Sequence, residues 1–94
     1  MNYTKIKVVF KDYTVLDISE DEVDVFKLSG EYAHIEYLND KGLWHRTDGP
    51  AVEWASGSKW WHKNGDLHRE GGLPAIEWAS GNKEWWENGE RIIR

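Results

Sequence analysis

The chain has 94 residues, no cysteine and a formal net charge of −5 at pH 7. This composition excludes disulfides, thiolate chemistry and cysteine-ligated zinc, and it disfavours direct binding to nucleic acid, which depends on neutralising phosphates. The sequence contains no long apolar stretch, so it predicts neither a membrane span nor a signal peptide. We therefore expect one small cytoplasmic domain that binds neither nucleic acid nor membrane.

The N-terminal part predicts a β-hairpin and then a short helix. Residues 4–18 are rich in β-branched and aromatic residues around a polar centre, which is typical of a hairpin. Ser19 and Glu22 have capping-box spacing, and Gly30 is a stop signal, so we expect a helix over about residues 20–28. Its outward side would carry the acidic residues Glu20, Asp21 and Asp24.

The remaining sequence repeats itself. Residues 51–65 recur with few changes as residues 75–89, and a proline precedes each copy. Repetition at such a period indicates supersecondary units that stack on their neighbours. Residues 32–46 predict one more hairpin, which we interpret as a degenerate first unit. The expected fold is mainly β: an antiparallel meander of repeated β-hairpins with one short helix near the N-terminus.

Turn residues predict how the strands pair. The two Asn-Gly pairs, at 64–65 and 88–89, favour two-residue type I′ turns. The Ser-Gly pair at 56–57 is read as a loop of similar length, which would pair Val52 with Trp61 and Glu53 with Trp60. Side chains alternate across a strand, so this register predicts two faces. The expected core face carries Val52, Trp54, Trp61, Ile76, Trp78, Trp85 and Ile92. The expected solvent face carries Glu53, Trp60, His62, Arg69, Glu77, Glu84, Trp86 and Arg91.

A His-Arg pair opens each unit. The first copy continues to Gly-Pro-Ala at 49–51, and the second is altered to Gly-Gly-Leu-Pro at 71–74. With the following Glu-Trp, Ser-Gly, Trp and Asn-Gly, residues 43–94 resemble the short MORN-like repeats of phage and bacterial proteins. The resemblance implies a sheet of β-hairpins, a cell interior and often a phage-encoded protein, but no single activity. We expect residues 1–42 (hairpin, helix and degenerate first strand) and residues 43–94 (two repeats) to form one compact domain.

Catalytic and metal-binding patterns are weak. The four histidines lack the short spacings of zinc ligands, and no motif arranges a nucleophile, a base and a carboxylate. We therefore expect no enzymatic activity, no metal and no cofactor.

The sharpest functional signal is aromatic residues among charged ones on the expected solvent face, a composition typical of binding hot spots. The alternative is that this face packs on the N-terminal hairpin or on a second copy of the chain, so a homodimer stays open. The candidate partner-binding residues are Trp60, Trp86, His62, Arg69 and Glu84, together with the acidic Glu20, Asp21 and Asp24.

Two functions fit this surface. The first is a non-catalytic protein-binding module, such as a small phage-encoded inhibitor that binds a basic host defence protein, for example a CRISPR effector or another nuclease. The second is a carbohydrate- or small-ligand-binding module that uses tryptophan platforms, with Trp60 beside Glu53 and Glu84. The absence of a targeting signal places the second function lower.

Overall fold

The computed structural model describes residues 3–93, in which it contains ten strands and one helix. Residues 1, 2 and 94 lie outside the described residues. They are the ends of the two expected segments, 1–42 and 43–94. The expected class, mainly β with a short helix near the N-terminus, is confirmed. The elements in chain order are β1 (Lys5–Phe10), β2 (Val15–Ile18), α1 (Glu20–Ser29), β3 (Tyr32–Leu38), β4 (Val52–Trp54), β5 (Lys59–Trp60), β6 (His62–Lys63), β7 (Asp66–Leu67), β8 (Ile76–Glu77), β9 (Lys83–Glu87) and β10 (Glu90–Ile92).

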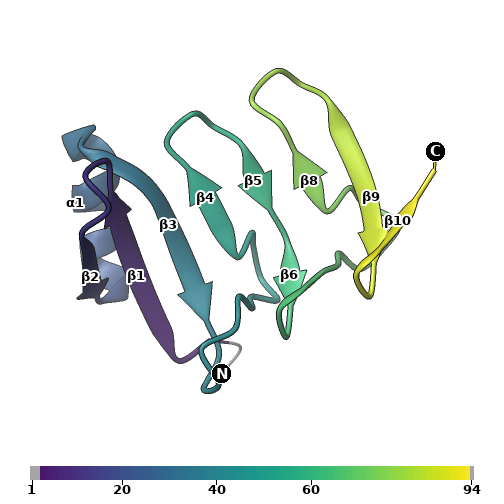
Figure 1. The fold of residues 1–94 in the computed structure, drawn as a ribbon, viewed down its shortest axis with the longest axis horizontal. Coiled ribbons are helices and arrows are strands. Elements are labelled where there is room, and N and C mark those ends of the chain that lie inside the picture. The colour runs from purple at the N-terminus through teal and green to yellow at the C-terminus, as the bar shows by residue number, and fades with distance from the viewer. Residues whose placement is uncertain (1–2, 94) are drawn as a thin grey trace.

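Eight strands form one antiparallel sheet in the order β10-β9-β8-β5-β4-β3-β1-β2, and β6 and β7 pair as a separate hairpin. From β3 onward the sheet order follows the chain, which confirms the meander (Figure 1). The N-terminal hairpin extends this sheet, because β1 lies between β2 and β3. It therefore continues the sheet beside the repeats.

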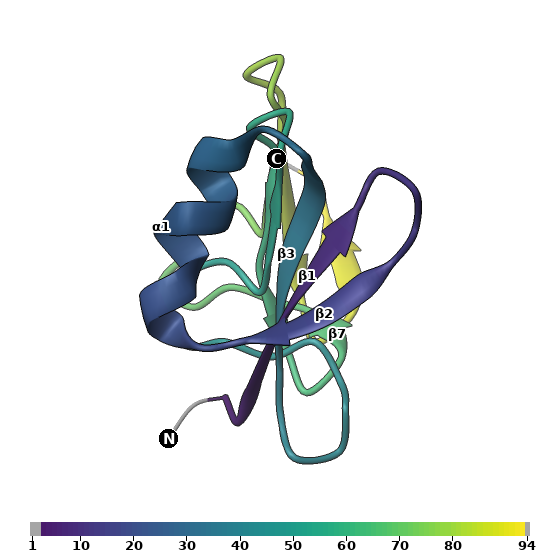
Figure 2. The ribbon, with the colours of Figure 1, turned by 90° about the vertical axis from the view of Figure 1, so that its left-hand side faces the viewer.

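Helix α1 begins and ends where its capping residues predict. The Ser19 N–H donates to the Glu22 carboxylate at 2.9 Å, and Gly30 ends the helix in the left-handed conformation with φ of 72°. Such caps satisfy backbone groups that a helix end leaves unpaired. Figure 2 shows α1 against one side of the sheet, over β1 and β3. We call this side the helix face.

The hydrophobic core lies between α1 and the N-terminal strands. Ile6, Val8, Ile35 and Tyr37 from β1 and β3 are buried together with Val23 of α1. The prediction that four tryptophans form the core is wrong. None of the seven tryptophans is buried, and Trp78 is 37% exposed.

The core prediction failed because the hairpin loops are one residue longer than expected. The Trp54 N–H donates to the Ser58 carbonyl at 3.0 Å, and the loop of residues 55–57 closes with Gly57 at φ of 103°. Val52 therefore pairs with Trp60, where the sequence predicted Trp61. A shift of one residue moves a side chain to the other face of a sheet. Both predicted faces are consequently mixtures of the two real ones.

The Asn-Gly turns, in contrast, have the expected form. Asn64 and Gly65 have φ of 50° and 90°, and Asn88 and Gly89 have 50° and 80°, as a type I′ turn requires. Lys63 pairs with Asp66 across the first turn.

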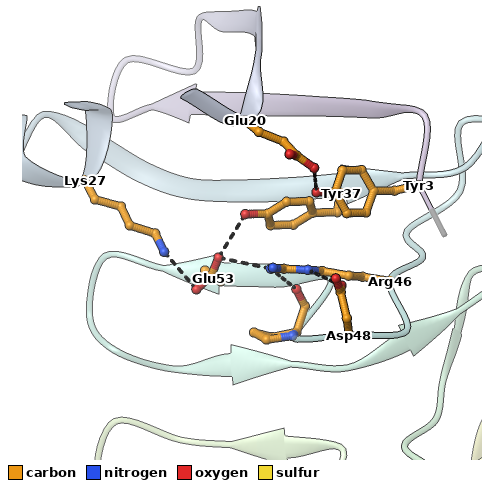
Figure 3. A network of polar contacts seen from close by, with 8 residues as sticks. Tyr3, Glu20, Lys27, Tyr37, Arg46, Asp48 and Glu53 are labelled. Carbon is orange, nitrogen blue, oxygen red and sulfur yellow. Dashed lines mark hydrogen bonds and ion pairs between the residues drawn. The ribbon is translucent and has the colours of Figure 1, made fainter. Parts of the chain in front are cut away.

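A half-buried arginine, Arg46, connects elements of the helix face (Figure 3). The Arg46 guanidinium lies 3.9 Å from the centroid of the Tyr37 ring and donates to the Pro50 carbonyl at 3.3 Å. Glu53 lies 3.5 Å from the same guanidinium, and its other oxygen accepts from Lys27 of α1 at 3.0 Å. The network therefore links α1, β3 and β4 through one guanidinium.

The second repeat contains the same arrangement. The Arg69 guanidinium lies 3.8 Å from the centroid of the Trp61 ring, and it donates to the Pro74 carbonyl and to Glu77, each at 3.1 Å. We call each such set, an arginine with its ring, its proline carbonyl and its glutamate, an arginine bridge. The His-Arg pairs are therefore scaffold residues, as their recurrence with the repeat suggests.

The location of the core gives a stability prediction. Replacing Ile35, which is fully buried, with alanine should lower the free energy of unfolding by roughly 2–5 kcal/mol. The matched control is Ile93→Ala, because Ile93 is 84% exposed and its loss should cost less than about 0.5 kcal/mol. Urea denaturation followed by circular dichroism measures both. Equal stability of the two variants would contradict this assignment of the core.

Candidate binding face

The side of the sheet opposite α1 carries a continuous row of aromatic rings. Paired residues share a face, so Trp60 lies on the same side as its partners Val52 and Ile76, and Trp54 lies there beside His34. Among the described residues, no helix covers this side (Figure 2). We call it the tryptophan face; its aromatic members are His34, Trp44, Trp54, Trp60, His62, Trp78 and Trp86.

Trp60 is the centre of this row. Its ring centroid lies 4.9 Å from that of Trp54, 6.0 Å from that of Trp78 and 6.1 Å from that of Trp44. The planes meet at 60° to 80°: Trp44 and Trp78 pack edge to face on Trp60, and Trp54 is tilted against it. Such packing holds the rings in fixed orientations. The cluster is therefore a preformed surface that needs little ordering to bind.

Two carboxylates fix the indoles at the two ends of the row. Glu84 accepts from Trp78 at 2.8 Å and from Trp86 at 3.1 Å, and Glu36 accepts from Trp44. The hydrogen bond from Trp78 is the main cause of a lowered pKa at Glu84. Hydrogen bonding from His34, with a smaller contribution from Trp44, lowers the pKa of Glu36. Both carboxylates are therefore ionised at neutral pH.

His62 lies inside the cluster and is only 6% exposed. Its ring centroid is 5.1 Å from that of Trp44, and its Nδ1 is 3.3 Å from the Gly65 carbonyl oxygen. Burial lowers the pKa of His62, so the ring is neutral at neutral pH. The side chain supports the indoles from beneath and offers little surface to a partner.

A shallow hollow of about 240 Å³ opens among the rings. It is lined by Trp54, Trp60 and Trp78, together with Ser56 and the buried Ser58. Ser58 is held in place, because its hydroxyl accepts from the Ala79 N–H at 2.9 Å.

The structure divides the candidate partner-binding residues between the two sides of the sheet. Trp60, His62, Glu84 and Trp86 lie on the tryptophan face, as described above. Arg69 lies on the helix face, where it forms the second arginine bridge. The acidic residues of α1 are exposed on the helix side, and Glu20 accepts from the Tyr3 hydroxyl. The acidic cluster and the tryptophans therefore cannot belong to one flat contact.

A larger groove, of about 380 Å³, lies on the helix face between the two arginine bridges. Its polar side chains already have partners: Arg46 lies 3.0 Å from Asp48, and His68 lies 3.0 Å from Glu70. Lys63 lies 3.5 Å from the same Glu70 oxygen. These pairs neutralise the groove from within, and for this reason we place the candidate site on the tryptophan face.

Sequence reasoning missed part of this face. Trp54 and Trp78 were assigned to the core, and Trp44 and His34 were not considered as contact residues. The sequence does contain a signal for the longer loop. A glycine, Gly57 or Gly81, stands at the third loop position in both copies, and three-residue hairpin loops end on a glycine in the left-handed conformation. With that loop length, Trp54, Trp60 and Trp78 fall on one face.

Comparisons with protein-family models, with curated proteins and with solved structures found no match. The resemblance to MORN-like repeats therefore stays a prediction. Within residues 3–93 there is no group of three or more histidine, aspartate or glutamate side chains that could hold a metal ion. The one helix in this range is too short and too polar to cross a membrane.

The indole–carboxylate hydrogen bonds predict a pH dependence of stability. Because folding lowers the pKa of Glu36 and Glu84, their contribution is present above the usual value of 4.5 and is lost as the pH falls through the folded-state pKa. The free energy of unfolding should therefore decrease between about pH 5 and pH 3. Glu36→Gln should flatten this slope in denaturation curves measured at several pH values. Glu31→Gln is the control, since Glu31 is exposed at the start of β3. An unchanged slope for Glu36→Gln would contradict the prediction.

Proposed function

We propose that this chain is a non-catalytic protein-binding module that contacts its partner through the tryptophan face. The observation that carries the proposal is the open row of interlocked indoles, of which Trp78 is 37% exposed, on the side of the sheet that α1 leaves uncovered. Large exposed aromatic surfaces are typical of binding sites, and tryptophan is the residue most enriched at their energetic centres.

The geometry favours a protein over a sugar as ligand. A sugar ring stacks on a flat indole beside free carboxylates, whereas these indoles meet at 60° to 80°. Glu84 is already bonded to two indoles, and Glu53 lies on the opposite face in the first arginine bridge. The groove of Trp60, Glu53 and Glu84 that a carbohydrate module would use is therefore not assembled.

A basic host protein, such as a nuclease of a defence system, remains our proposed partner because the chain has a net charge of −5. The tryptophan face and the acidic residues of α1 lie on opposite sides of the sheet, so we propose a different role for each. The tryptophans would supply the contact, and the acids of α1 would act at longer range on the rate of encounter.

Comparative capture tests the contact surface. Trp78→Ser and Trp86→Ser should each remove the partner that the wild-type chain retains from a host lysate, since hot-spot losses reach about 2 kcal/mol or more. The matched control is Leu28→Ser, because Leu28 is 88% exposed on α1. Trp60 is unsuitable for this test, because its ring packs against four others, those of Trp44, Trp54, His62 and Trp78. Equal capture by wild type, Trp78→Ser and Trp86→Ser would overturn the proposal. A wild-type dimer in sedimentation experiments that Trp78→Ser dissociates would assign the face to a second copy of the chain.

The charge of α1 predicts a kinetic effect. Neutralising Asp21 and Asp24 together as Asn should slow association with the captured partner at low salt and leave dissociation unchanged, because exposed charges act mainly before contact. The effect should largely disappear in about 0.5 M salt, where the screening length falls below 5 Å. Surface plasmon resonance at two salt concentrations measures both rates. A faster dissociation in this variant would place α1 inside the contact.

A further inference from the structure

The aromatic rings of the two faces differ in whether an arginine of the same chain stacks on them. On the helix face, Tyr37 and Trp61 each have an arginine of the same chain stacked 3.8–3.9 Å away. On the tryptophan face, no arginine or lysine among the described residues lies over Trp54, Trp60 or Trp78. The hollow between these three rings therefore has aromatic walls without a cation of its own.

We infer that the hollow of Trp54, Trp60 and Trp78 binds an arginine or lysine side chain of the partner protein. This inference rests on the proposed function and names the chemistry of its central contact. Ring faces attract cations through their quadrupole, and the attraction increases when the cation leaves water. The planes of Trp54 and Trp78 are inclined at 60° and 80° to that of Trp60. Three rings in this arrangement can contact a bound side chain from several directions, whereas one flat ring contacts it from one.

The surrounding charges support a cationic occupant. The Trp78 indole N–H donates to the ionised Glu84, which makes the electron-rich ring beside the hollow more attractive to a cation. Arg91 offsets part of this charge from 3.8 Å, but its side chain is 53% exposed, so solvent weakens its effect. Ser56, which is exposed, also lines the hollow, and its hydroxyl oxygen can accept a hydrogen bond from a guanidinium or ammonium.

The experiment titrates the full chain, labelled with ¹⁵N in its indoles, with two blocked tripeptides, acetyl-Gly-Arg-Gly-amide and acetyl-Gly-citrulline-Gly-amide. Citrulline has nearly the shape of arginine and no charge. The indole signals of Trp54, Trp60 and Trp78 should shift, and the arginine peptide should bind about fivefold more tightly than the citrulline peptide. Single Trp→Phe variants assign the signals.

Trp78→Leu separates the ring from general attraction to an acidic protein. It keeps an apolar wall and the net charge, so it should bring the arginine and citrulline affinities to the same value. Trp85→Leu is the matched control, because Trp85 pairs with Ile92 on the helix face, and it should keep the wild-type ratio. The dispersion of the backbone amide spectrum verifies that both variants are folded.

Each other result overturns the cation site. Equal affinities of the two peptides for wild type would mean that the hollow takes a neutral side chain. Shifts confined to Trp61 and Trp85, or no shift at all, would mean that it takes no basic side chain. None of these results decides the proposed function, which the capture comparison with Trp78→Ser tests separately.

Discussion

The fold depends on a guanidinium that stacks on a ring and bonds to the next strand. Arg46 and Arg69 each combine a ring contact under 4 Å with bonds to a proline carbonyl and a glutamate carboxylate. Arginine suits this task, because its planar fork can stack and donate at the same time. The sheet strands β4, β5, β8 and β10 have only two or three residues and few ladder hydrogen bonds, so the repeat hairpins need a second attachment to their neighbours. The arginine bridges provide it, at 19% and 23% side-chain exposure.

The α1 core and the arginine bridges occupy one side of the sheet, and the indoles, with the carboxylates that accept hydrogen bonds from them, occupy the other. The buried residues of the repeats, Ala51, Val52, Ala75 and Ile76, are small or medium-sized. Large indoles can therefore lie above them without filling a core. This separation explains why a chain with seven tryptophans buries none of them. It also explains why changes on the tryptophan face should alter binding more than folding, with the exception of Trp60 at the centre of the cluster.

Local signals predicted much of the fold, and one local feature, the length of the Ser-Gly loops, was misjudged. The hairpin of residues 4–18, the Ser19 cap, the Gly30 stop and the Asn-Gly turns follow from backbone preferences of a few residues, and all are present. The register of the Ser-Gly hairpins was wrong, because Trp60 and Trp61 are adjacent and either can satisfy an apolar pattern. The deciding fact is whether Trp54 closes its loop with Ser58, which hydrophobic periodicity does not specify. One residue of loop length therefore determined which tryptophans share the candidate site.

The two repeats keep the arginine bridges and differ at several positions of the tryptophan face. The helix face keeps arginine, ring and glutamate in both units, whereas the tryptophan face has Trp60 where the next unit has Glu84, and His62 where the next has Trp86. The exchanged residues also contact their neighbours favourably. Glu84 accepts hydrogen bonds from the indole N–H groups of Trp78 and Trp86, and the neutral His62 ring packs against Trp44. A repeat that served only as a scaffold would have no reason to diverge at neighbouring positions of a single face. The divergence fits the proposed binding surface, since each position of such a surface would meet a different part of its ligand.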